Sequence, residues 1–424
     1  MCKPWMAWLA AAMLLLTACG GGNNDRTKAK LRLVNSSSGY SLLDLRVDDT
    51  LTQGAVAYGN TAGYADVSPG NAASAITVAG SATALLSFTP AMSKDRYYTL
   101  LAYGGQGALK QALLDDNASQ PDSGRALLRV VNAAPDAGAL DIYLTASGEP
   151  LASAVPAQSA AAVGAVGEWL TVNAATWQLR ITAAGNKADL RIDLPALALP
   201  SRQVATLVIT PGRGGALVNT LLLEQQGSIT PGASPQARVR LAAGVADGGA
   251  VAARVGGSVL ATNVGSPAVD VYSLVSADTV PVVVSVNGQA VPMPDAALRP
   301  GADYTLLVRG TPGAAEATWI EDDNTLPGNT SQAKLRLVHG VAGFTALLAM
   351  TADFVPVADG VDPGTASTPR LVSATTAASL SVTGSGRSTP LFSAVDQRFE
   401  AGAVYTVFVV GPAASAVGIL RKDR

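Results

Sequence analysis

The residue type most often used in catalysis occurs once in the 424-residue chain, as His339. A Ser-His-Asp or Cys-His arrangement would have to use this side chain, since serine and aspartate are plentiful around it in the sequence. His339 ends a strand-like segment at the position where related segments carry Asn35, Asn132 and Ala243. We therefore expect a polar residue at a strand end, and we predict no catalytic residues and no enzymatic activity.

Two acidic clusters, Asp115-Asp116-Asn117 and 321–324, follow corresponding strand-like segments. Oxygen ligands of this kind can hold calcium at a domain junction, but no Asp-x-Asp-x-Asp-Gly loop accompanies them. Asp and Asn at strand ends commonly form turns, which is the interpretation favoured here. The same applies to Asp136 after Pro135, while Asp141 is expected to alternate outward. We predict no metal site and no cofactor. Calcium binding by the two acidic clusters is the alternative.

Sugar recognition would need exposed aromatic rings, and residues 20–424 contain three tryptophans, Trp169, Trp177 and Trp319. An exposed coplanar pair of Trp169 and Trp177 would favour glycan binding. Core packing is the favoured interpretation. The glycine-rich segments 104–107 and 211–215 lack the strand–glycine–helix context of a phosphate loop, so we expect hairpin turns there.

The N-terminus carries the most specific chemical signal. Lys3 precedes an apolar stretch from Trp5 to Leu16, which is too short to span a bilayer and is typical of a signal peptide. It ends in Leu16-Thr17-Ala18-Cys19, which resembles a bacterial lipobox. There, lipoprotein signal peptidase would recognise Leu16, Thr17 and Ala18, and Cys19 would carry the lipid. Several acyl chains at about 0.8 kcal/mol per buried methylene give stable anchoring.

The amino-acid composition limits the possible fold classes and functions. Charged residues make up 14% of the chain and hydrophobic residues 48%, so a packed interior is feasible. The net charge of −2 gives no support for nucleic-acid binding. The only cysteines are Cys2 and Cys19, so no disulfide is expected after processing. With 43 glycines and 24 prolines, many short strands separated by turns are favoured over helices.

A strand-like motif with alternating polar and apolar residues recurs four times, at intervals of roughly 100 residues. It contains Arg32, Arg129, Arg240 and Arg336, each flanked by apolar residues that fall on the opposite face. A closing motif recurs as well, beginning with Tyr98-Thr, Tyr304-Thr and Tyr405-Thr, with a looser copy at Ala205-Thr. The tyrosines are expected either to close a corner, as in immunoglobulin-like sandwiches, or simply to fill the core.

These repeats predict an all-β fold of tandem immunoglobulin-like antiparallel β-sandwiches behind a lipoprotein signal peptide. Segments rich in Pro, Gly and Ser separate the modules, which predicts a semi-rigid string. Val269-Asp-Val-Tyr272 resembles Leu140-Asp-Ile-Tyr143, but it lies further from its opening arginine, so the likeness is interpreted as incidental. The predicted organisation is a signal peptide (1–18), a lipidated tether (19–28) and four modules (29–123, 124–235, 236–332 and 333–424).

The segment from Leu128 to Tyr143, together with the Tyr-Thr strands, resembles the bacterial domain-of-unknown-function family 4397, which occurs in tandem in secreted and lipid-anchored proteins. The resemblance is strongest in the second module and implies β-sandwich modules in the cell envelope. It brings no catalytic residues.

We therefore expect a non-enzymatic, lipid-anchored cell-envelope protein that serves as a binding, adhesive or spacer array on the outer membrane. Its partners would be the membrane, through the N-terminal lipid, and an unidentified glycan or protein ligand, with the chain itself a monomer. An envelope hydrolase accessory or carbohydrate-binding protein is the alternative.

Overall fold

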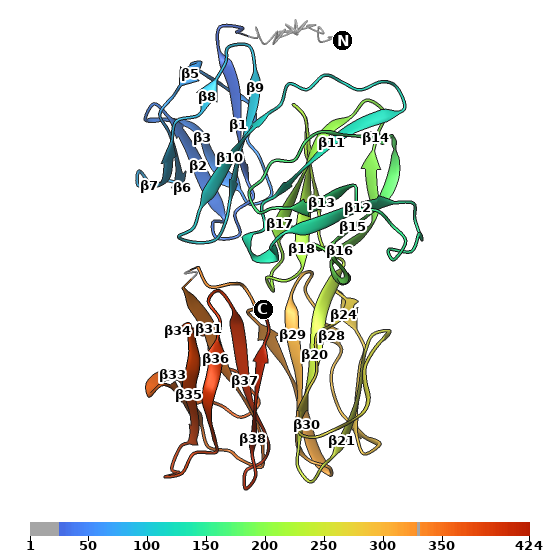
Figure 1. Ribbon diagram of the computed structural model, residues 1–424, viewed down its shortest axis with the longest axis vertical. Coiled ribbons are helices and arrows are strands. Elements are labelled where there is room, and N and C mark those ends of the chain that lie inside the picture. Colours follow the sequence, from blue (N-terminus) through green and yellow to red (C-terminus); the bar gives the residue numbers. More distant parts are fainter. Residues whose placement is uncertain (1–24, 329–330) are drawn as a thin grey trace, which may run out of the picture.

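The computed structural model describes residues 25–328 and 331–424, which form four β-sandwiches in chain order. Figure 1 shows modules 1 (blue) and 2 (green) side by side above modules 3 (yellow) and 4 (orange to red). Each sandwich has an inner sheet, which contains the opening and closing strands, and an outer sheet. The described residues contain a single short 3-10 helix, η1 (Pro135–Ala137). The prediction of an all-β fold is therefore confirmed.

Module 1 combines two four-stranded sheets with one short ribbon. The inner sheet has the order β10 (Lys110–Asp115), β9 (Tyr97–Tyr103), β1 (Ala29–Asn35) and β4 (Ala65–Val67). The outer sheet has the order β3 (Thr50–Ala57), β2 (Leu42–Val47), β6 (Ser74–Val78) and β7 (Ala84–Phe88). The ribbon consists of β5 (Gly70–Asn71) and β8 (Ala91–Met92).

Module 2 has one additional strand at the edge of its inner sheet. That sheet has the order β14 (Leu170–Asn173), β11 (Arg125–Asn132), β17 (Val204–Pro211), β18 (Val218–Glu224) and β19 (Ile229–Gly232). The outer sheet has the order β13 (Gln158–Ala161), β12 (Leu140–Thr145), β15 (Ala175–Ala183) and β16 (Asn186–Leu199).

Module 3 repeats the arrangement of module 1. Its inner sheet has the order β23 (Ala268–Val269), β20 (Gln236–Val245), β29 (Asp303–Thr311) and β30 (Ala314–Asp322), with β24 (Ser273–Ser276) also on β20. The outer sheet has the order β22 (Ser258–Gly265), β21 (Ala250–Val255), β26 (Val282–Val286) and β27 (Gln289–Val291). The ribbon here consists of β25 (Thr279–Val280) and β28 (Ala296–Ala297).

Module 4 consists of two four-stranded sheets. The inner sheet has the order β34 (Arg370–Ser373), β31 (Gln332–Ala342), β37 (Val404–Pro412) and β38 (Val417–Lys422). The outer sheet has the order β33 (Val355–Val361), β32 (Leu348–Ala352), β35 (Thr375–Gly384) and β36 (Phe392–Phe399).

The opening strand of every module lies parallel to its closing strand, as in the pairing of β1 with β9 and of β31 with β37. The other strand pairs are antiparallel. The alternation of polar and apolar residues does not predict this parallel pair. It matters because it places the two repeated sequence motifs side by side at the centre of each inner sheet.

The modules do not form a string of separate sandwiches. The inner sheets of modules 1 and 2 share an apolar cluster that includes Val34, Leu101, Val131 and Val208. The inner sheets of modules 3 and 4 share another around Leu307 and Phe408 in the same way. Each pair of modules is thus a stack of four sheets, and the predicted string is corrected to two stacked pairs.

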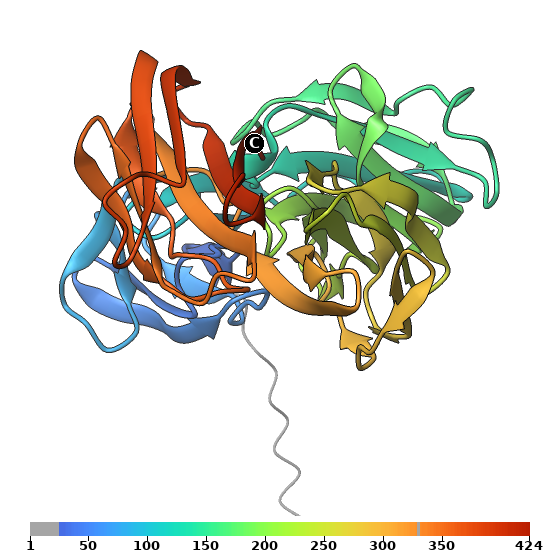
Figure 2. The same ribbon diagram turned by 90° about the horizontal axis from the view of Figure 1, so that it is seen from below.

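The two pairs meet through loops of module 2. Gly214 donates its N–H to the carbonyl of Gly301 at 2.8 Å, and a Cβ at Gly214 would lie 2.5 Å from the Asp303 side chain. Arg213 pairs with Glu321 at 2.8 Å near the same point. The two pairs are turned relative to each other, as the view from below shows (Figure 2).

Candidate functional site

The two repeated motifs meet through an arginine–threonine hydrogen bond in every module. The parallel register places Arg32 opposite Thr99 and Arg129 opposite Thr206. Each arginine Nε donates to the threonine hydroxyl, at 2.7 Å in both modules. The corresponding bonds from Arg240 to Thr305 and from Arg336 to Thr406 measure 2.9 Å.

These arginines face away from their own sandwich core, as the alternation predicts, yet they are not exposed to solvent. Their exposed fractions are only 2% for Arg32, Arg240 and Arg336 and 5% for Arg129. The next module of the pair covers them, a fact that the alternation within one strand cannot reveal. They form two buried clusters, one in each pair.

The first cluster is centred on Asp116, which lies just after β10. Its carboxylate lies 3.3 Å from Nη2 of Arg129 and 3.9 Å from Nη2 of Arg32, so it joins arginines of two modules. It also accepts hydrogen bonds from the hydroxyls of Thr99 and Tyr64. Arg32 further donates to the main-chain carbonyls of Gly227 (2.7 Å) and Glu224 (3.0 Å) in module 2.

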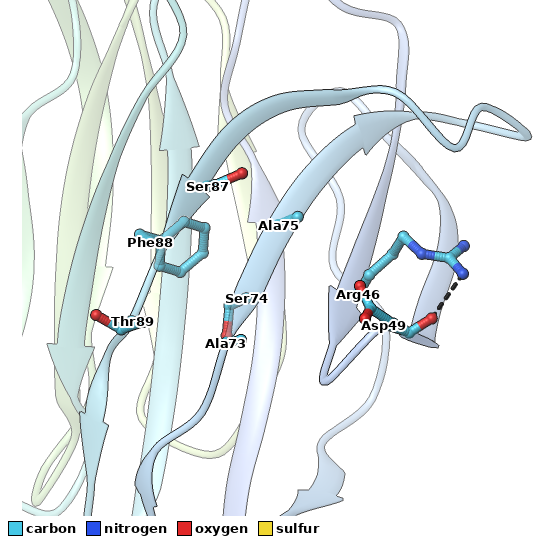
Figure 3. Close-up of a pocket in the computed structure, with 8 residues that line it drawn as sticks. All are labelled: Arg46, Asp49, Ala73, Ser74, Ala75, Ser87, Phe88 and Thr89. Atoms are coloured by element: carbon cyan, nitrogen blue, oxygen red, sulfur yellow. Dashed lines mark hydrogen bonds between the residues drawn. The ribbon is translucent and has the colours of Figure 1, made fainter.

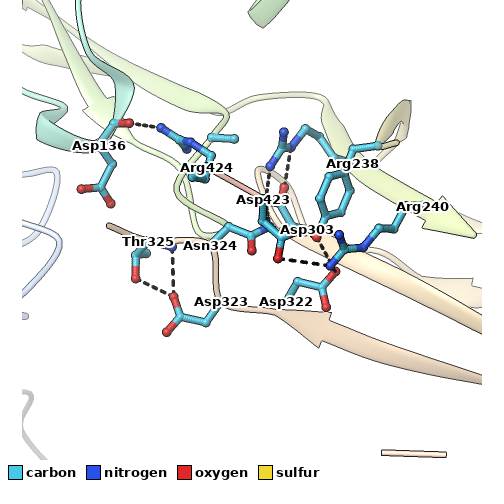
Figure 4. Close-up of polar contacts among 12 residues, drawn as sticks. Asp136, Arg238, Arg240, Asp303, Asp322, Asp323, Asn324, Thr325, Asp423 and Arg424 are labelled. Atoms are coloured by element: carbon cyan, nitrogen blue, oxygen red, sulfur yellow. Dashed lines mark hydrogen bonds and ion pairs between the residues drawn. The ribbon is translucent and has the colours of Figure 1, made fainter. Parts of the chain in front are cut away.

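The second cluster contains two carboxylates, Asp322 and Asp423 (Figure 4). Asp322 accepts from Nη2 of Arg336 at 2.5 Å and lies 3.6 Å from Nη2 of Arg240. Asp423, which follows β38, binds Nη1 of Arg240 and accepts from the Thr406 hydroxyl at 2.5 Å. The second cluster therefore matches two guanidinium groups with two carboxylates.

The balance of charge and burial differs between the clusters. Burial raises the pKa of Asp116, and the surrounding hydroxyls and arginines offset this only in part. Burial also raises the pKa of Asp322, but the charges of Arg336 and Arg240 and the hydroxyls of Thr305 and Tyr272 together outweigh burial, so the pKa of Asp322 lies below its usual value. In both clusters burial, followed by the nearby aspartate, raises the pKa of the tyrosine, Tyr64 or Tyr272.

An aromatic ring stacks on the arginine in three of the four modules. The guanidinium carbon lies 4.8 Å from the Tyr64 ring centroid for Arg32 and 4.4 Å from the Trp169 ring for Arg129. Arg240 lies 4.4 Å from the Tyr272 ring. Tyr272 thus lies beside the inner sheet, whereas Tyr143 belongs to the outer strand β12, which confirms that their sequence likeness is incidental.

The corner tyrosines combine both roles that were left open. The hydroxyl of Tyr98 accepts the N–H of Ser93, five residues upstream, at 3.0 Å, and Tyr98 is also part of the core of module 1. Tyr304 and Tyr405 do the same in modules 3 and 4. Module 2 carries Ala205 at this position, so its closing strand lacks the corner.

His339 is fully buried and hydrogen-bonded as a structural residue. Its Nε2 contacts the carbonyl of Ala346 at 3.1 Å, and its Nδ1 accepts the N–H of Val341 at 3.4 Å. Asn35 and Asn132 likewise accept the N–H two residues ahead and donate to main-chain carbonyls. Burial lowers the pKa of His339, in keeping with a neutral ring.

The acidic residues have partners within the protein. Asp141 does not point into solvent as expected: it is 6% exposed, and its carboxylate accepts the N–H groups of Ala160 (2.8 Å) and Gly185 (2.9 Å). Asp136 lies in η1, so the predicted turn is confirmed. The described part of the chain contains no group of three or more His, Cys, Asp or Glu residues arranged to hold a metal ion.

The tryptophans do not form an exposed pair. Trp169 is half-buried against Arg129, and Trp177 packs against the core of module 2 while its Nε1 donates to the carbonyl of Asn173. Trp319 packs edge-on against Tyr304 in module 3. The glycine-rich segments 104–107 and 211–215 connect neighbouring antiparallel strands, as predicted.

Shallow hollows mark the surface, and one of about 430 Å³ lies on the outer sheet of module 1 (Figure 3). Arg46, Ser74 and Phe88 contribute to its lining, and Arg46 donates to the carbonyl of Asp49 at 2.7 Å. The predicted lipid site at Cys19 and the recognition residues Leu16, Thr17 and Ala18 lie outside the described residues. Within those residues, no helix has the length and apolar character needed to cross a bilayer.

The fold and its two buried clusters define a tandem β-sandwich protein whose modules are held in stacked pairs by arginine–carboxylate contacts. The chain belongs to the family called domain of unknown function, DUF4397, which matches residues 29–143 and 237–350, more than half of the sequence. Each match starts at the opening strand of an odd-numbered module and ends early in the next module. Each therefore includes both arginines and the central aspartate of one cluster.

No curated protein matches the chain. Among solved structures, the Bacillus anthracis TIE protein is similar over 87% of this chain, at 8% sequence identity and a TM-score of 0.15. The chain spans 65% of the length of that protein. A TM-score this low supports no argument about fold or function.

Proposed function

We propose that the protein is a non-enzymatic, lipid-anchored binding or spacer scaffold of the cell envelope, attached to the outer membrane through Cys19. The non-enzymatic part of this proposal rests on one observation: the side chains that could do chemistry are buried and hydrogen-bonded within the protein. His339, Asp116 and Asp322 are buried, and each holds the fold together through hydrogen bonds. Groups already bound to the protein on several sides are poorly placed to activate a substrate.

A scaffold role is supported by the way the modules are joined. Within each pair, two inner sheets share an apolar interior and a charged cluster, so bending between the two modules would expose both. Such an assembly keeps its length and holds its outer sheets and loops at a set distance from an anchor. The anchor itself rests on the sequence Leu16-Thr17-Ala18-Cys19.

Metabolic labelling with an alkyne analogue of palmitate, followed by membrane fractionation of the producing bacterium, tests the anchor. The full chain should take up label and sediment with the outer membrane. Cys19→Ala should lose both properties, and Cys2→Ala is the matched control that should keep them. An unlabelled wild-type chain, or a labelled Cys19→Ala chain, contradicts the proposal.

The binding role is tested separately with the purified Cys19→Ala protein on glycan arrays and on whole cells. Saturable binding to an array glycan would support the carbohydrate-binding alternative. Turnover of an envelope polymer by the same preparation would refute the non-enzymatic assignment.

A further inference from the structure

One end of the outer sheet in module 1 carries an arginine whose side chain is only partly bonded. Arg46 lies on β2, where the register pairs it with Ala75 of β6, and Ala75 in turn pairs with Ser87 of β7. Nη2 of Arg46 donates to the carbonyl of Asp49 at 2.7 Å. Its Nε and Nη1 have no partner among the described residues and are not buried, so they remain available to a ligand.

Module 3 has an arginine at the same position but different surroundings. Arg254 on β21 pairs with Val283 of β26 and donates to the carbonyl three residues ahead, at Gly257. Val283 is 61% exposed where module 1 has the small Ala75. Gly257 takes the turn position of Asp49, so it supplies no carboxylate. Module 1 therefore combines open space with an acid at a place where module 3 has neither.

The open space is the hollow of about 430 Å³ on module 1. In Figure 3 the Phe88 ring and the Arg46 guanidinium lie on opposite sides of three small residues, Ala73, Ser74 and Ala75. The volume is within the range of about 300–1,000 Å³ that is typical of small-ligand sites. The hollow can therefore take one small ligand that has both apolar and polar groups.

The polar groups around the hollow include donors and acceptors. Asp49 is exposed, and its carboxylate accepts no hydrogen bond within the described part of the chain. Ser87 and Thr89 add two exposed hydroxyls, which can both donate and accept. With the free N–H groups of Arg46, these side chains can pair with several hydroxyls of one ligand at the same time.

We propose that this hollow binds a neutral sugar unit of a glycan. Arg46 donates to one ring hydroxyl and Asp49 accepts from its neighbour, while the C–H groups of the sugar contact Ala75 and the Phe88 ring. The adjacent Asp48 and Asp49 supply two carboxylates against the one guanidinium, so an acidic sugar or a phosphate would meet a net negative charge. An apolar ligand would cover the polar groups without pairing them, which costs free energy.

This inference rests on the proposed binding role and gives it a ligand class. It is independent of the anchor, because the hollow lies in module 1 and can be tested in a chain without lipid. Glycan or cell binding that does not use the hollow would leave the binding role standing and overturn only this site.

The test is a titration of the purified Cys19→Ala chain with maltotriose, cellotriose and N,N′,N″-triacetylchitotriose, followed by the NMR signals of the Arg46 Nε–H and the Ala75 methyl group. We expect at least one of these neutral trisaccharides to shift both signals saturably. Trigalacturonic acid, which is negatively charged, should bind at least tenfold more weakly. No shift with any neutral trisaccharide, or equal binding of the charged one, would overturn the proposal.

Module 3 supplies the variants. Ala75→Val and Asp49→Gly each introduce the residue that module 3 has at that position, so both should fold, and each should weaken binding of the trisaccharide at least tenfold. Val283→Ala is the matched control on module 3 and should leave that binding unchanged. Circular dichroism establishes that each variant is folded, and if one of the first two fails to fold, the other decides. Unchanged binding by folded Ala75→Val contradicts the assignment.

Discussion

The two pairs of modules solve the same packing problem with different numbers of charges. Both place two arginines between inner sheets, but the first pair supplies one carboxylate, Asp116, and the second supplies two, Asp322 and Asp423. Gln225 occupies the position that corresponds to Asp423, since their N–H groups bond the equivalent carbonyls of Val204 and Val404.

In place of a second carboxylate, the first pair uses main-chain carbonyls. Gln225 turns its amide to the main chain of Ala118, and Arg32 is satisfied by the carbonyls of Glu224 and Gly227. A buried guanidinium can therefore be satisfied by neutral dipoles or by a second charge, and the choice determines how the interface responds to pH and to mutation.

Removal of the central carboxylate should have the largest effect. Asp322→Ala leaves Arg336 without its closest charged partner, and breaking a buried ion pair costs about 3–5 kcal/mol. We expect the free energy of unfolding of the second pair to fall by this amount, measured by hydrogen exchange of its inner-sheet amides. Asp323→Ala, at the neighbouring half-exposed acid, should cost under about 1 kcal/mol.

The same substitution in the first pair sharpens the comparison. Asp116→Ala should cost less than Asp322→Ala, because Arg32 keeps its two carbonyl partners. Equal losses in the two pairs would show that the carbonyls do not substitute for a charge.

A smaller effect is expected when the second cluster is reduced to one carboxylate, as in the first cluster. Asp423→Asn keeps the shape of the side chain but removes one charge opposite Arg240, and hydrogen bonds to charged groups contribute about 1.5–3 kcal/mol. The backbone amides in the inner sheets of modules 3 and 4 should exchange hydrogen faster, by the factor that corresponds to this loss of free energy. If modules 3 and 4 no longer packed against each other, the result would mean that the second cluster needs both carboxylates to satisfy Arg240.

Acid should separate the two pairs in stability. The pKa of Asp322 is lowered in the folded protein, so its contribution is present above the normal value of 3.8 and is lost as the pH falls through the folded pKa. The pKa of Asp116 is raised, so its contribution is present below 3.8 and is lost as the pH rises through the folded pKa.

Between neutral pH and about pH 3, the second pair should therefore lose more stability than the first, with each unit of pKa difference worth about 1.4 kcal/mol. Hydrogen exchange measured across this range in both pairs tests the prediction. Asp322→Asn should flatten the pH dependence of the second pair only, and a steeper loss in the first pair would contradict the assignment.

The smallest effect tests whether the two pairs share one framework outside the clusters. His339→Asn should change the free energy of unfolding by less than about 1 kcal/mol, because Asn35 and Asn132 make the same two kinds of hydrogen bond at the corresponding positions. Chemical denaturation would measure this. His339→Leu is the contrasting variant, since it leaves the N–H of Val341 without its acceptor, and it should cost about 1–3 kcal/mol.

Much of the fold follows from local pattern. Alternation around Leu31 and Leu33 identifies a strand, as the structure confirms, and recurrence of the motif predicts four modules. The stacking of modules in pairs is harder to predict from the sequence, because alternation shows only that the two faces of a strand differ. A signal was present in the closing strands: Tyr98–Tyr103 and Val404–Val410 are apolar at nearly every position, which is typical of strands buried on both faces.

The clusters themselves could not be predicted from one sequence. Asp116 and Asp322 were recognised as a repeated acidic feature, but the partner of each comes partly from another module, more than ten residues away along the chain. Tyr64 and Tyr272 both lie 32 residues after their arginines (64−32 and 272−240), a sequence signal that went unused, whereas Trp169 differs in type and lies 40 residues after Arg129 (169−129). Only the register of the folded strands shows that Trp169 is equivalent to these two tyrosines.

The strand that follows each closing strand has a mechanical consequence. In module 1, β10 returns antiparallel along β9 and ends with Asp115 opposite Tyr98, at the same end of the inner sheet where β1 begins with Lys30 opposite Tyr97. A pull applied to the two ends of this module would therefore load β10 first and break its hydrogen bonds to β9 one after another. The parallel pair of β1 and β9 would bear the load only after this edge strand had come away.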